Sequence, residues 1–120
     1  MSPFTPAPVK PVVSVEGLKA FDIRVGRITA VTDIPSSDRL VRLTVDFGDH
    51  RRQIVAGLKK ERADFTEIQG KQALFVLNLE PRRIRGELSE GMLFDIGYAD
   101  GIVPVLAVPE REVPDGTRAE

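Results

Sequence analysis

The sequence predicts an all-β fold, an OB-type five-stranded barrel with a short helical insert and a C-terminal β extension. Five or six short segments with strand-type alternation recur at regular spacing, turn residues separate them, and little else has helical periodicity. The helical stretch falls between the third and fourth predicted strands, a usual place for an insert in this architecture. A β-sandwich stays open, because one sequence does not determine strand pairing.

Length and composition indicate one domain. The chain has 120 residues, 42% of them hydrophobic, which is material for one core. We expect a flexible arm over residues 1–18, because four prolines within its first eleven positions remove amide donors that a sheet needs. Residues 19–120 are expected to form the folded domain.

The first three strands are predicted from alternation. Residues 21–30 show the side-chain alternation of a strand on both sides of Gly26, and this glycine would suit a bulge or a tight bend. Residues 40–47 give the clearest pattern, with apolar side chains at every second position. A short turn containing glycine leads into residues 51–56, so these two strands should form an antiparallel hairpin.

The second half of the chain begins with the helical stretch, residues 58–68, which is charge-rich and expected to be short or irregular. Residues 71–79 are apolar on nearly both faces, as in a central strand. Residues 92–98 and 102–107 flank a glycine-containing turn and predict a C-terminal hairpin.

Composition excludes several classes of function. The chain has no cysteine, which excludes disulfides, thiolate nucleophiles and zinc–thiolate sites. It has no apolar run long enough to span a membrane and no secretory-type start, so we expect a cytoplasmic protein without a membrane partner.

Charge is distributed unevenly, although the net charge is only −1. Residues 1–85 carry 15 basic and 10 acidic side chains, whereas residues 86–120 carry 2 basic and 8 acidic ones. A chain polarised in this way can present a basic face to a polyanion, unless folding intermixes the two segments.

The stretch 78–92 is the strongest functional signal. Arg82, Arg83 and Arg85 follow directly on the predicted central strand. A guanidinium group binds two phosphate oxygens at once and stays charged at any working pH. These arginines therefore predict a phosphate-facing loop, and the alternative is a solvated loop that keeps the chain soluble.

Four segments together, residues 22–28, 43–48, 52–57 and 78–92, resemble the tRNA-binding domain family. This domain occurs free-standing in bacteria, as the C-terminal part of many methionyl-tRNA synthetases, and in endothelial-monocyte-activating polypeptide II. The resemblance implies an OB-fold, a homodimer in free-standing members, and recognition of folded tRNA by shape rather than by base sequence.

The family pattern falls residue by residue on the stretch 78–92. Glu80 departs from it, because members commonly have lysine there, so one phosphate contact would be lost. The matched positions are Asn78, Leu79, Glu80, Pro81, Arg82, Arg83, Gly86, Ser89, Gly91 and Met92.

We expect the three arginines to capture phosphate, with Arg42 or Arg52 of the neighbouring hairpin in support. Asn78 and Ser89 would hydrogen-bond sugar or base edges, and the resemblance adds Met92 as an apolar contact. Asn78 could instead tie down the adjacent loop, and a methionine that opens an apolar strand is usually core. The candidate RNA-binding residues are Asn78, Arg82, Arg83, Arg85, Ser89, Met92, Arg42 and Arg52.

A second branch of the superfamily, the bacterial export-related chaperones, is similar at residues 81–84 and 45–48. It implies binding of an unfolded presecretory protein, here through an apolar groove near Met92, Phe94 and Tyr98. The possible partners are therefore tRNA, an aminoacyl-tRNA synthetase or an unfolded protein client.

No catalytic, cofactor or metal site is predicted. The only histidine, His50, lies in a turn beside Asp49 with no serine nearby, and the pair Asp46 and Asp49 lacks further ligands at metal-binding spacing. The apolar residues 102–106 and 108–109 exceed what a barrel rim requires, and they predict a homodimer.

Overall fold

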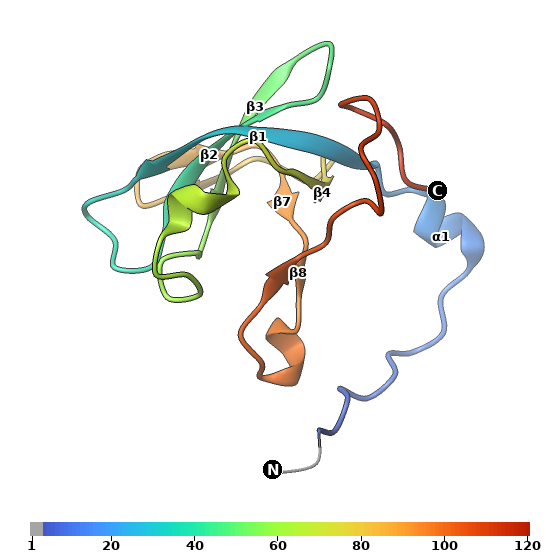
Figure 1. Cartoon of the computed structure of the whole chain (residues 1–120). Coiled ribbons are helices and arrows are strands. Elements are labelled where there is room, and N and C mark those ends of the chain that lie inside the picture. Colours follow the sequence, from blue (N-terminus) through green and yellow to red (C-terminus); the bar gives the residue numbers. More distant parts are fainter. Residues whose placement is uncertain (1–3) are drawn as a thin grey trace.

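The computed structural model describes residues 4–120, so residues 1–3 of the expected arm lie outside the described residues. Strands dominate the fold (Figure 1). The elements are α1 (Val15–Lys19), β1 (Ile23–Asp33), β2 (Val41–Asp46), β3 (Arg51–Ala56), the 3₁₀ turn η1 (Phe65–Ile68), β4 (Gln72–Val76), β5 (Arg82–Ile84), β6 (Glu87–Ser89), β7 (Met92–Leu93), β8 (Asp95–Ile96), the 3₁₀ turn η2 (Tyr98–Asp100) and β9 (Val105–Leu106).

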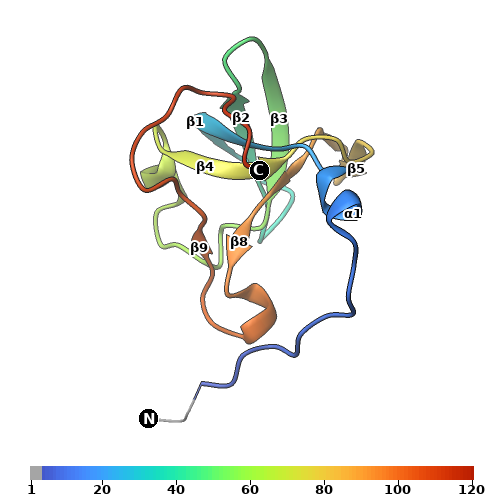
Figure 2. The ribbon, with the colours of Figure 1, turned by 90° about the vertical axis from the view of Figure 1, so that its right-hand side faces the viewer.

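Five antiparallel strands form a nearly closed barrel in the order β3-β2-β1-β4-β7. The segment around β6 bridges its two edges. The amide of Glu90 donates to the carbonyl of Gln53 at 2.8 Å, and the amide of Val55 donates to the Ser89 hydroxyl at 3.0 Å. The predicted five-stranded barrel is confirmed, and the pair β8–β9 extends away from it (Figure 2).

The core lies inside the barrel and follows the predicted alternation. Leu43 and Val45 of β2 are fully buried, while the intervening Thr44 is partly exposed. Phe47 and Phe75 meet edge to face, with ring centroids 5.6 Å apart. Aromatic pairs favour this geometry because the edge of one ring is positive and the face of the other is negative.

Gly26 has a different role from the one that its sequence context suggested. The bulge in β1 lies between Ile28 and Ala30, not at Gly26. A Cβ atom at Gly26 would come within 2.5 Å of the Val45 side chain and 2.6 Å of Phe47. Glycine is needed here because the core packs directly against the backbone of β1.

Two local differences concern helices. Of the stretch 58–68, only η1 is helical, and the Asp64 side chain caps it by accepting from the Thr66 amide at 3.0 Å. Conversely, α1 falls at the end of the expected arm, where the Ser14 hydroxyl accepts from the Gly17 amide at 3.0 Å. The remaining described part of the arm has no helix or strand and runs away from the barrel (Figure 1).

The C-terminal residues return to the start of β1. The amide of Gly116 donates to the carbonyl of Val25 at 2.7 Å, and the amide of Val25 donates to the carbonyl of Thr117 at 2.8 Å. This return places the C-terminus beside α1 (Figure 1).

Candidate nucleic-acid interface

The arginine-rich stretch forms a small hairpin, β5–β6, and not the open loop that the sequence indicated. Arg82 pairs with Ser89, Arg83 with Leu88, and Ile84 with Glu87. The two turn residues are Arg85, at φ 54°, and Gly86, at φ 80°. A two-residue turn with positive φ at both positions matches the twist of the flanking strands.

The hairpin separates the arginines in space. Neighbouring strand residues point to opposite faces, so Arg82 lies on the face shared with Ser89, and Arg83 lies on the face shared with Leu88. Arg85 stands at the turn. The three guanidinium groups therefore lie on both faces and at the tip of the hairpin, and not on one surface.

These three arginines are exposed and carry no ion pair within the described residues. Over residues 4–120, the one side-chain hydrogen bond of these arginines is a long contact of 3.5 Å from Arg83 Nη1 to the carbonyl of Gly86. Their charge is therefore available to an anion.

Arg42, expected to assist the arginines, contacts a carboxylate instead. Its Nη1 donates to both oxygens of Glu87, at 3.2 and 3.3 Å, and Gln53 Nε2 donates to the same carboxylate at 3.2 Å. Glu87 was not among the residues singled out from the sequence. Its place opposite Ile84 in the hairpin turns it toward the barrel, and only the strand register reveals this.

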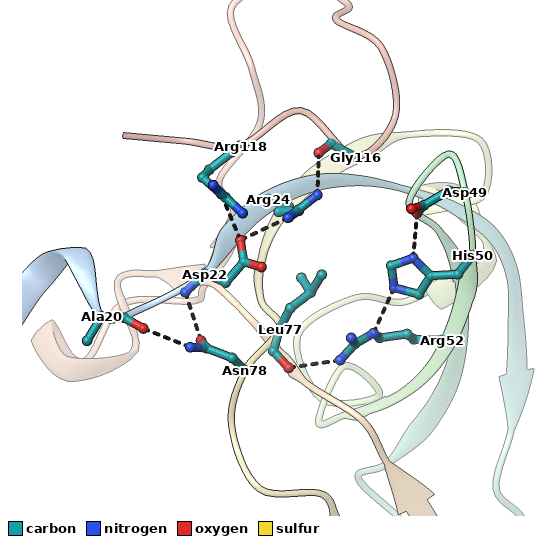
Figure 3. Close-up of polar contacts among 10 residues, drawn as sticks. All are labelled: Ala20, Asp22, Arg24, Asp49, His50, Arg52, Leu77, Asn78, Gly116 and Arg118. Atoms are coloured by element: carbon teal, nitrogen blue, oxygen red, sulfur yellow. Dashed lines mark hydrogen bonds and ion pairs between the residues drawn. The ribbon is translucent and has the colours of Figure 1, made fainter.

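Arg52 is also engaged inside the protein (Figure 3). Its Nη1 donates to the carbonyls of Leu77 at 2.8 Å and Glu90 at 3.0 Å, and its Nε donates to His50 Nε2 at 3.0 Å. The other ring nitrogen of His50 lies 2.7 Å from Asp49 Oδ1. Arg52 thus joins the residue that follows β4 to the residue that follows the hairpin.

Asn78 ties two segments together, which is the alternative that the sequence left open. Its side-chain oxygen accepts from the amide of Asp22 at 2.7 Å, and its side-chain nitrogen donates to the carbonyl of Ala20 at 2.7 Å (Figure 3). The Asp22 carboxylate accepts from Arg24 at 2.9 Å and Arg118 at 3.2 Å, and the hydrogen bond from Arg24 is the main cause that lowers the pKa of Asp22. Asn78 therefore fixes the junction of α1 and β1.

Ser89 and Met92 differ sharply in exposure. Ser89 is 5% exposed, and its hydroxyl both accepts from the Val55 amide and donates to the carbonyl of Gly91 at 3.1 Å. Met92 is 45% exposed, although it begins a strand paired with β4. An RNA contact of Arg42, Arg52, Asn78 or Ser89 stays a prediction, and each would have to coexist with these internal bonds.

Comparison with known proteins identifies the family. The family model described as "Putative tRNA binding domain" matches residues 23–118. The chain belongs to this tRNA-binding domain family. The domain is 42% identical to the methionine–tRNA ligase of Thermococcus kodakarensis over 106 residues, which cover 88% of this chain and 14% of the ligase.

Solved structures agree with the assignment. A methionyl-tRNA-synthetase-related protein from Pyrococcus horikoshii matches with a TM-score of 0.84 and 32% identity, covering 92% of this chain and all of that one. The chaperone CsaA of Bacillus anthracis matches with a TM-score of 0.78 and 28% identity over 92% of this chain and all of that one. The predicted OB-type fold and family resemblance are confirmed.

The domain spans only 14–16% of the length of the methionine–tRNA ligases that it matches. Within residues 4–120, no helix is long and apolar enough to cross a membrane. In the same residues, no three histidine or acidic side chains gather where they could hold a metal ion.

Proposed function

We propose that this domain binds folded tRNA through the β5–β6 hairpin. The observation that carries the proposal is the set of three exposed arginines on one hairpin, none with a carboxylate partner among the described residues. Phosphate neutralisation by such side chains supplies most of the affinity of proteins for nucleic acids. Since tRNA is used in the cytoplasm, this function agrees with the location expected from the sequence.

The geometry of the hairpin favours a folded RNA over a linear one. Arg83 lies on the outer face of the hairpin, whereas Arg82 lies exposed at the edge of the face that packs against the barrel, so the two guanidinium groups point in different directions. Folded tRNA brings phosphates of non-parallel helices and loops close together, whereas a regular duplex offers phosphates only along the parallel rims of its grooves. The stretch 78–92 contains no aromatic residue, which leaves little capacity for base stacking and favours recognition by shape.

The residues with internal bonds have a positioning role in this proposal. Glu87 and Ser89 anchor β6 to the barrel through Arg42 and Val55, and Arg52 binds the backbone next to the hairpin. These contacts hold the three free arginines on a rigid support. Rigid placement lowers the conformational entropy that phosphate binding would otherwise cost.

A gel-shift titration tests the proposal directly. Bulk tRNA and a linear RNA duplex of equal charge compete for the protein at physiological salt. The tRNA should be retained preferentially, because a folded RNA can place phosphates against guanidinium groups that point in different directions. Equal retention of the two RNAs would reduce the interaction to general polyanion attraction and overturn the proposal.

A homodimer accompanies this function. Tyr98 and Val103 are 76% and 68% exposed, and Ile96, Ile102 and Val105 beside them are about half exposed. Such an apolar surface on the β8–β9 extension is unfavourable in water unless a second copy covers it. Analytical ultracentrifugation should give the mass of two chains at micromolar concentration, and the mass of one chain would contradict the dimer.

Chaperone activity is the second candidate, supported by the similarity to CsaA. The groove that the sequence suggested is divided, because Met92 lines a hollow beside the hairpin, whereas Tyr98 lines another hollow between the β8–β9 extension and the segment after β3. A client would therefore use the second hollow. Suppression of aggregation of a denatured protein tests this candidate, and absence of protection by the wild type would reject it.

A further inference from the structure

A small hollow lies between the β5–β6 hairpin and the barrel, on the face of the hairpin that carries Arg82. Its volume is about 120 Å³. It is lined by Val55, Leu79, Glu80, Arg82, Ile84, Ser89, Gly91 and Met92.

The inside of the hollow is apolar. Leu79 and Met92, 37% and 45% exposed, form walls together with the partly buried Ile84. The Ser89 hydroxyl already donates one hydrogen bond and accepts another, so the floor presents no free donor. Hydrogen-bonding capacity is left mainly at the rim, where Glu80 and Arg82 stand.

The size of the hollow limits what it can hold. Sites for free small molecules usually measure roughly 300 Å³ or more, so this hollow suits one ring system that is attached to a larger ligand. A nucleobase has apolar faces and a polar edge, and in RNA it is joined to the phosphates that Arg82, Arg83 and Arg85 would bind. Unpaired bases of folded RNA are commonly held between side chains in this way.

Glu80 gives the hollow its chemical character. No ion pair joins Glu80 to Arg82 or to another cation within the described residues. A free carboxylate accepts hydrogen bonds from exocyclic amino groups, which cytosine, adenine and guanine carry. Uracil has a carbonyl oxygen where cytosine has this amino group, and its one ring donor, N3–H, lies between two carbonyl oxygens that Glu80 would repel.

We propose that this hollow receives one unpaired, amino-bearing base of the bound RNA, with Arg82 on a phosphate beside that base and Glu80 accepting from its amino group. This inference rests on the proposed tRNA-binding function. It also gives Glu80 a positive role at a position where a negative charge would otherwise only weaken phosphate binding.

Short fluorescent oligocytidylate and oligouridylate of equal length test the inference by anisotropy. The wild type should bind the cytidylate about five- to tenfold more tightly, the effect of one hydrogen bond at a solvent-exposed rim. Glu80→Lys should strengthen binding of both oligonucleotides and abolish the preference for cytidylate. Glu80→Gln should reduce this preference without abolishing it. The control Arg83→Ala, on the opposite hairpin face, should weaken both equally and keep the preference.

Methyl NMR locates the base independently. Ring currents should shift the methyl signals of Met92 and Ile84 when cytidylate is added, but not when inorganic polyphosphate is added. Equal affinity for the two oligonucleotides, or a preference that persists in Glu80→Lys, would overturn the inference. The inference would also be overturned if an apolar peptide shifted these methyl signals and RNA did not.

The outcomes separate this inference from the function beneath it. If tRNA binding depends on the hairpin arginines but no base preference exists, the base hollow is wrong and the tRNA-binding proposal stands. If neither tRNA nor the oligonucleotides bind through those arginines, the proposed function itself is wrong.

Discussion

Arg42 of β2 donates to both carboxylate oxygens of Glu87 in β6, and this pair joins the arginine hairpin to the barrel. Both side chains are about one-third or less exposed, at 35% and 25%. Because of this contact, the charge of Arg42 is not free to bind an anion. The contact also holds the hairpin in a defined position, although each of its strands has only three residues.

Separating this pair should loosen the hairpin. A double-mutant cycle with Arg42→Met and Glu87→Gln should give a coupling free energy of about 1 kcal/mol, as is typical for partly exposed pairs. Chemical unfolding of the four proteins measures it. A coupling indistinguishable from zero would mean that Ser89 and Glu90 alone position the hairpin.

Gly26→Ala should destabilise the barrel by about 1–3 kcal/mol, because the new methyl group would overlap Val45 and Phe47 in a packed core. Gly57→Ala is the matched control, since its Cβ would first meet the flexible side chain of Arg39 at 3.2 Å. Thermal unfolding compares the two. Equal melting temperatures would contradict the close packing of β1 against the core.

Asn78→Ala should lower stability by about 1–2 kcal/mol, because it leaves the Asp22 amide and the Ala20 carbonyl without their partner. Amide hydrogen exchange at Asp22 should accelerate, while tRNA affinity should stay near the wild-type value. A large loss of tRNA affinity without a loss of stability would instead show that Asn78 contacts RNA.

Stability should fall as the pH rises toward neutrality. Burial, with Asp95 nearby as a further cause, raises the pKa of Glu61 from 4.5 to about 7. A carboxyl group whose pKa is higher in the folded than in the unfolded protein stabilises the fold fully at a pH below its unfolded-state pKa. This stabilisation is lost as the pH rises from the unfolded-state pKa to the folded-state pKa.

Glu61→Gln should remove this pH dependence, whose size is on the order of 1 kcal/mol after screening by solvent. Denaturation across the pH range measures it, with Glu16→Gln, at an exposed residue far from Glu61 in the sequence, as the control. An unchanged slope in Glu61→Gln would assign the pH dependence to other groups.

The sequence predicted the elements with strong local patterns. Alternation of apolar and polar residues located β2 and β3. The run that is apolar on both faces predicted a central strand, and in the structure β4 lies between β1 and β7. Helix α1 was missed because five residues give too little periodicity to recognise, and the bulge was misplaced because glycine serves both bends and close packing.

The site was predicted less completely than the fold. Three arginines within four residues were visible in the sequence, but the pairing of Arg82 with Ser89 and of Arg83 with Leu88 decides which way each side chain points. The carboxylate partner of Arg42 and the carbonyl partners of Arg52 are more than twenty residues away in sequence, so no local pattern could show these contacts.

The salt dependence of tRNA binding tests the central proposal most directly. Replacing Arg82, Arg83 and Arg85 together by alanine should flatten the slope of log affinity against log salt by about 2–3, roughly one counterion for each lost phosphate contact. The exposed Arg111→Ala should leave the slope unchanged. A triple variant that stays folded and keeps the wild-type affinity and slope would contradict binding through the β5–β6 hairpin.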